Sequence, residues 1–124
     1  MSPNILIDGL CFGEGPRFRN NFLWLSDMHA QEVLKVTPDG QRTTVTSLVD
    51  DQPSGLGWLP DGDLLIVSMT KKQLLRWDGQ VLHLHADLSE LASGICNDMV
   101  VDHQGRAYVG NFGFDLHNNE KPKP

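Results

Sequence analysis

The sequence has few cysteines, few basic residues and no long hydrophobic run. Cys11 and Cys96 are far apart and lack CxxC spacing, so we expect reduced thiols in a cytoplasmic protein. The ten Lys and Arg residues are scattered and the formal net charge is −6, which argues against nucleic acids and anionic membranes as partners. The longest apolar runs, such as Leu64 to Val67, are far too short to cross a bilayer. Residues 1–10 show no basic and apolar pattern typical of an export signal.

Helical periodicity is also scarce, because it occurs only weakly, over residues 87–92. The other segments are short, apolar or alternating, and are separated by turns that contain glycine. Pro38-Asp39-Gly40 and Pro60-Asp61-Gly62 place proline where φ near −65° is wanted and glycine where φ must be positive. This pattern predicts an all-β fold.

The β segments repeat. Ser54 and Gly62 recur as Asn97 and Gly105, in each case 43 residues later, and Ser54 aligns with Glu14, 40 residues earlier. A period in the low forties with four short strands is typical of a propeller blade. The repeat therefore predicts a partial β-propeller.

We predict about two and a half four-stranded blades within residues 1–116. The segment at residues 5–8 resembles an outer strand of a last blade. The tail at residues 117–124 is polar and proline-containing, so we expect it to be mobile. The predicted units are blade one at about residues 16–48, blade two at about 54–85 and the first half of blade three at about 97–111.

Glu14, Ser54 and Asn97 share one position in the repeat, just before the innermost strand of each unit. This position faces the axial channel of a propeller, so residues from different blades converge there. Carboxylate and amide oxygens suit Ca²⁺ or another cation that prefers oxygen ligands. Asp98 follows directly and is a further candidate for lining the channel. The alternative is that Asn97 and Asp98 cap a turn and Glu14 is a solvated loop residue.

Other motifs point to structure more than to chemistry. The stretch GEGPRF begins like a dinucleotide-binding loop, but its third glycine is replaced by phenylalanine and no βαβ unit follows. His83 and His85 alternate on one strand, where a polar outer face is favoured over a zinc site. No GxSxG motif is present. We expect the three tryptophans to fill the space between blades: Trp24, Trp58 and Trp77.

Three stretches together resemble the senescence marker protein, gluconolactonase and luciferin-regenerating enzyme family: FGEGPRF with LWLSDM, PSGLGWLPDGDLLIVSM and CNDMVVDHQGRAYVGNFGFDL. The resemblance extends over residues 5–116. It implies a six-bladed propeller with one divalent metal ion in the axial channel and, for many members, hydrolysis of sugar lactones. Ca²⁺ is the favoured ion, with Zn²⁺, Mg²⁺ and Mn²⁺ as alternatives.

The resemblance also assigns residues. Glu14 matches the family's metal-binding glutamate, and Asn97 matches an asparagine that contacts substrate or a metal-bound water. Regucalcin-type members carry an arginine two residues before that asparagine, where this chain has Ile95. The family's later asparagine ligand, and the aspartate that is ligand and general base, have no counterpart here. Six blades need about 270 residues, so the chain resembles the first two-fifths of a family member and contains no catalytic residue of its own.

Three functional hypotheses follow. The favoured one is a metal-dependent lactone hydrolase, or the N-terminal part of one, acting on a small lactone. The others are a non-catalytic propeller that serves as a binding scaffold, and an inactive truncated product. An arc of blades has open edges, so self-association is also expected.

Overall fold

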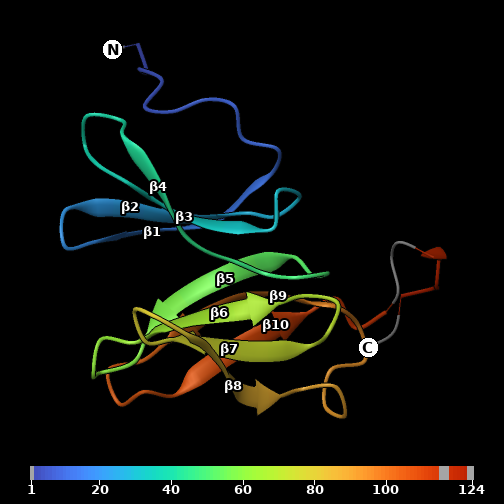
Figure 1. Ribbon diagram of the computed structural model, residues 1–124. Coiled ribbons are helices and arrows are strands. Elements are labelled where there is room, and N and C mark those ends of the chain that lie inside the picture. Colours follow the sequence, from blue (N-terminus) through green and yellow to red (C-terminus); the bar gives the residue numbers. More distant parts are fainter. Residues whose placement is uncertain (1, 115–117, 123–124) are drawn as a thin grey trace.

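The computed structural model describes residues 2–114 and 118–122, within which ten strands form three antiparallel sheets (Figure 1). Blade one contains β1 (Gly13–Arg19), β2 (Phe22–Asp27), β3 (Glu32–Val36) and β4 (Arg42–Ser47). Blade two contains β5 (Pro53–Trp58), β6 (Leu64–Ser68), β7 (Gln73–Trp77) and β8 (Leu82–Asp87). Blade three contains β9 (Cys96–Val101) and β10 (Ala107–Asn111). The predicted all-β fold and partial arc are confirmed, because the three sheets stack without closing into a ring.

The tight turns within the blades are the ones that the sequence predicts. Gly40 and Gly62 have φ values of 90° and 95°. The backbone N–H of Gly40 donates to the carbonyl oxygen of Thr37, and that of Gly62 to Leu59, at 3.0 and 2.9 Å. Positive φ is easily adopted by glycine, so these residues fix the hairpins that bring successive strands side by side.

The central strand of blade two, β6, is buried along its whole length. Leu64 and Ile66 pack in a cluster with Val33 of blade one, whereas Leu65 and Val67 pack in a cluster with residues of blade three. Successive side chains of a strand point to opposite faces. The continuous apolar run of β6 therefore reflects a blade that is covered on both faces by its neighbours.

The tryptophans pack between blades one and two, as predicted. Trp24 of β2 and Trp58 of β5 lie edge to face, with ring centroids 5.4 Å apart, and Trp77 packs against the same cluster. The guanidinium of Arg19 lies 5.0 Å from the Trp58 ring centroid. Aromatic and cation–π contacts thus join the two blades at this interface.

The N-terminal segment covers the outer face of blade one (Figure 1). Ile7 and Leu10 pack against the cluster of Leu25, Leu34 and Val36. Residues 5–8 form no strand in the described part of the chain, where no neighbouring strand lies beside them to share a hydrogen-bond ladder. Ile7 packs against blade one, whereas Ile5 is exposed, and the outer strand of a last blade stays a prediction.

Blade three has an open outer side. Val100 and Tyr108 lie opposite each other in the β9–β10 ladder and are 60% and 55% exposed. Val109, in contrast, is partly buried against blade two.

The weakly helical segment at residues 87–92 forms one turn, in which the N–H of Ala92 donates to the carbonyl oxygen of Leu88.

Two further expectations concern the C-terminal tail and membrane-spanning segments. The polar tail at residues 117–124 lies partly outside the described residues, and its mobility stays a prediction. No helix in the described residues has the length and apolar character needed to span a membrane.

Candidate functional site

Each innermost strand contains a β-bulge near its start. In β1 the ladder slips between Glu14 and Arg17, and in β5 it slips between Pro53 and Leu56. In β9 the slip is read from the partner strand, between Val109 and Asn111. In each case the inner strand has one residue more than the second strand opposite it. Bulges redirect side chains and are frequent next to functional sites.

The strand pairing corrects the predicted alignment of the three site residues. Glu14 pairs with Ser26 in the ladder, but the residues at the corresponding place in β5 and β9 are Pro53 and Cys96. Ser54 and Asn97 each come one residue later, inside the bulge. The three residues therefore do not share one register. The turn between β1 and β2 is shorter than the turn between β5 and β6, so no single shift along the sequence aligns both strands of blade one with those of blade two.

Glu14 and Asn97 nevertheless line the same pocket, of about 330 Å³. Blades one and three both contribute to it, and Met69, which follows β6, supplies the part from blade two. The pocket thus combines one carboxylate and one amide with a largely apolar and aromatic wall. The remaining lining residues are Phe12, Met28, His29 and Phe112.

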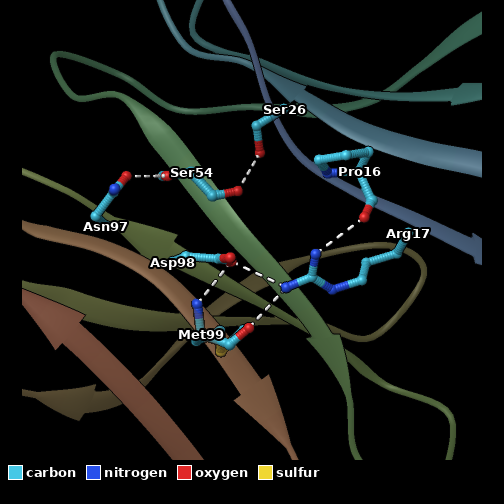
Figure 2. Close-up of polar contacts among 7 residues, drawn as sticks. All are labelled: Pro16, Arg17, Ser26, Ser54, Asn97, Asp98 and Met99. Carbon is cyan, nitrogen blue, oxygen red and sulfur yellow. Dashed lines mark hydrogen bonds and ion pairs between the residues drawn. The ribbon is translucent and has the colours of Figure 1, made fainter.

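Ser54 lies behind Asn97 and is not among the residues that line this pocket. Its side chain is fully buried, and its Oγ donates a hydrogen bond to Oδ1 of Asn97 at 2.8 Å (Figure 2). Ser26 in turn donates its hydroxyl to the carbonyl oxygen of Ser54 at 2.7 Å. A line of hydrogen bonds therefore runs from blade one through blade two to the amide in blade three.

Asp98 is exposed and binds Arg17, outside the pocket lining (Figure 2). The Nη2 atom of Arg17 lies 2.9 Å from Oδ1 of Asp98 and donates to the carbonyl oxygen of Met99 at 2.8 Å. Because Arg17 belongs to β1 and Asp98 to β9, the arginine links blades one and three directly. In this structure Ser54 and Asp98 make contacts between blades, and their predicted channel-lining roles stay predictions.

A buried carboxylate holds the loop that leads to Glu14. Asp27, at the end of β2, accepts hydrogen bonds from the backbone N–H groups of Cys11 and Phe12 at 2.9 and 2.8 Å. Burial raises the pKa of Asp27, but these hydrogen bonds outweigh burial and keep that pKa below its ordinary value. Asp27 is therefore ionised at neutral pH and fixes Phe12 at the pocket wall.

A second buried carboxylate, Asp51, holds the loop after β6. It accepts hydrogen bonds from the hydroxyl groups of Ser68 and Thr70 and from the backbone N–H groups of Thr70 and Lys71. Burial raises the pKa of Asp51, but these hydrogen bonds outweigh burial and lower that pKa overall. Asp51 thereby fixes the loop that carries Met69 into the pocket.

The donor set of the pocket suits part of a cation site. Glu14 offers a carboxylate, whereas Oδ1 of Asn97 already accepts a hydrogen bond from Ser54. Ca²⁺ takes six to eight oxygen ligands. The described residues contain no group of three or more His, Cys, Asp or Glu side chains arranged to hold a metal ion. Glu14 fits the role of one ligand, and the described residues do not complete the set.

Among the histidines and cysteines of residues 2–114, His29 lines this pocket. His83 and His85 are exposed on β8, and Nε2 of His83 lies 2.7 Å from Oδ2 of Asp78. Both cysteines are free thiols. Burial raises the pKa of the Cys96 thiol, so that thiol is un-ionised at neutral pH.

Bulged inner strands, stacked blade by blade around one pocket, define an open β-propeller arc. The sequence matches the family described as the SMP-30/gluconolactonase/LRE-like region over residues 12–123, and the chain belongs to that family. No curated protein sequence matches the chain.

Solved structures share the fold. A gluconolactonase of Xanthomonas campestris is 21% identical with a TM-score of 0.75, and the match covers 87% of this chain and 37% of that one. The calcium-binding protein regucalcin of Agrobacterium tumefaciens is 18% identical with a TM-score of 0.66, covering 88% and 43%. A protein of unknown function from Bacteroides thetaiotaomicron is 23% identical with a TM-score of 0.59, covering 73% and 30%. The chain thus spans less than half the length of these proteins.

Sequence reasoning missed the residues that support the site. Asp27 and Asp51 are acidic residues directly beside apolar strands, which was a usable signal for buried carboxylates. Arg17 is the first residue after a proline-containing bulge, and nothing in its spacing indicates a partner 81 residues away. The aromatic wall, with Phe12 and Phe112, lies in loops whose positions only the packed blades define.

Proposed function

We propose that this chain forms the first blades of a metal-dependent lactone hydrolase and supplies part of its site. The observation that supports the proposal is the convergence of Glu14 and Asn97, 83 positions apart in the sequence, on one pocket at the start of the inner strands. Membership of a family whose name includes gluconolactonase points to the same chemistry.

In this proposal Glu14 contributes a carboxylate oxygen to a divalent cation, with Ca²⁺ favoured. The bound cation would supply the Lewis acid that lactone opening needs. Asn97 holds the substrate or a water molecule through its amide, and the apolar wall of Phe12, Met69 and Phe112 excludes bulk water from the reacting ester. The general base lies outside the described residues of this chain.

The first test is metal binding by the chain itself. We expect Mn²⁺, followed by water-proton relaxation, to bind only weakly, in the millimolar range typical of an incomplete oxygen site. E14Q should abolish this binding, and E90Q should leave it unchanged, because Glu90 is exposed and lies outside the pocket. Equal binding by the chain and by E14Q would contradict the proposed role of Glu14.

The second test is hydrolysis. The chain alone should not hydrolyse lactones, because Glu14 and Asn97 offer too few ligands and no base. Turnover should be gained when the remaining blades of a family member are supplied in trans, and E14Q should remove it again. Complexes that assemble without turnover would favour a non-catalytic binding scaffold.

A further inference from the structure

The hydrogen bond between Ser54 and Asn97 determines which atoms of the amide face the pocket. Ser54 is fully buried, and Asn97 is the one partner of its hydroxyl among the described residues. A buried O–H group without an acceptor is costly. If the amide were reversed, Nδ2 would donate to Oγ and the hydroxyl hydrogen of Ser54 would be left without an acceptor. Donation from Oγ to Oδ1 satisfies both groups, and it leaves Nδ2 for another partner.

The Nδ2 atom of Asn97 is accessible. Among the described residues it donates to no protein group, and it is not one of the buried polar atoms that lack a partner. Asn97 lines the pocket together with Glu14. An accessible N–H group in this position can therefore donate to a molecule bound in the pocket.

We propose that Ser54 is a positioning residue whose buried hydroxyl holds Oδ1 of Asn97, so that the amide presents its N–H group to the pocket. The pocket then combines a hydrogen-bond acceptor and cation ligand, Glu14, with a neutral donor, Asn97. The ligand class that this pair recognises is an oxygen acceptor next to a cation, such as an ester carbonyl. The ligand class rests on the proposed function, whereas the orientation of the amide does not.

Ser26 gives a matched control. Its side chain is also fully buried and also donates a hydrogen bond between blades, but it donates to the backbone oxygen of Ser54. S26A and S54A therefore each remove one buried serine hydroxyl that donates a hydrogen bond between blades. Only S54A removes the contact with the amide of Asn97.

The test follows the side-chain amide of Asn97 by ¹H–¹⁵N NMR, with the signal assigned by its loss in N97D. We expect S54A to shift this signal and to speed the exchange of its hydrogens severalfold, and S26A to leave it unchanged. S54C keeps a side chain of similar shape with a weaker donor, so it should give a smaller change of the same kind and serves if S54A does not fold. An Asn97 signal that is the same in the unmodified chain, S54A and S54C would overturn the proposal.

A double-mutant cycle gives an independent readout, in which urea unfolding measures the folding equilibrium constant of each variant. S54A and N97A should be coupled by about fivefold in the folding equilibrium constant, the value of one net hydrogen bond. S26A and N97A should be additive. Purely structural packing of Ser54 would give additivity in both cycles and would contradict the proposal.

Adding Mn²⁺ as the probe distinguishes a failure of the proposed metal site from a failure of the role of Ser54. Broadening of the Asn97 signal that E14Q abolishes, together with no effect of S54A, would support the metal site and overturn the role of Ser54. An S54A effect without Mn²⁺ broadening would support the positioning role and contradict the metal site.

Discussion

At the scale of single residues, buried aspartates determine where the pocket loops lie. Asp51 is 3% exposed and accepts hydrogen bonds from backbone N–H groups of the loop after β6, the loop that carries Met69. Asparagine has nearly the same shape, but it carries no charge and offers a single acceptor oxygen. At least one donor would therefore lose its partner in the variant, and the charge-assisted hydrogen bonds would weaken.

We predict that D51N lowers the free energy of unfolding by about 3 kcal/mol at pH 7. D50N is the control, because Asp50 is the adjacent residue, is exposed, and has a φ of 55° that asparagine tolerates. Urea unfolding followed by tryptophan fluorescence measures both. A loss below 0.5 kcal/mol for D51N would show that water replaces the carboxylate contacts.

The same carboxylate predicts a pH dependence. The pKa of Asp51 is lower in the folded chain than its ordinary value of 3.8. Its contribution to stability is therefore complete above about pH 4 and is lost as the pH falls through the folded pKa. The unfolding curves of the unmodified chain and D51N should approach each other at acid pH, and a difference that stays constant from pH 7 to pH 2 would contradict this.

At the scale of elements, the bulged inner strands approach one another too closely for side chains at some positions. A Cβ atom added at Gly55 of β5 would lie 2.5 Å from the backbone N of Met99 in β9. At Gly110 of β10 the nearest atom would be the carbonyl oxygen of Asp98, at 3.7 Å. Only the first site needs glycine for lack of space.

We predict that G55A costs about 3 kcal/mol, because β5 and β9 would have to separate. G110A should change stability by less than about 0.5 kcal/mol. Thermal and urea unfolding of the two variants measure the difference. Equal stabilities would mean that the inner strands can slide apart without cost.

How far the sequence predicts this structure depends on the element. The hairpins follow from Gly40 and Gly62, because turn chemistry is local, and the repeat follows from the 43 residues between Gly62 and Gly105. The alignment of Glu14 with Ser54 was one residue off, because the β1–β2 turn is shorter than the β5–β6 turn and one repeat length cannot fit both strands. The pocket wall could not be predicted, since Phe12 and Phe112 become neighbours only through the stacking of three blades.

At the scale of the whole molecule, the outer side of blade three stays uncovered. Val100 and Tyr108 are exposed there, and β10 pairs only with β9 in the described structure. Unpaired edge strands with apolar side chains promote association between chains. The net charge of −6 is screened within about 8 Å in physiological salt and opposes this only weakly.

We predict that the chain self-associates in a concentration-dependent manner. The double substitution V100K/Y108K should shift sedimentation velocity profiles toward the monomer. V81K is the control, because Val81 is 53% exposed but lies next to the outer strand β8. A monodisperse monomer at all concentrations would show that this side is covered in another way.

The two-sided burial of β6 has a consequence for how the arc comes apart. Blade two shares its buried side chains with blades one and three and has no separate core. The stability of each blade therefore depends on its neighbours, and we expect the middle blade to unfold last. The amide hydrogens of Leu65, Ile66 and Val67 should therefore exchange with solvent more slowly than those of β4 and β8, at the rate of complete unfolding. Amide exchange by NMR tests this, and fast exchange in β6 would mean that the blades open one at a time. The stability of the arc therefore resides mainly in the interfaces between blades.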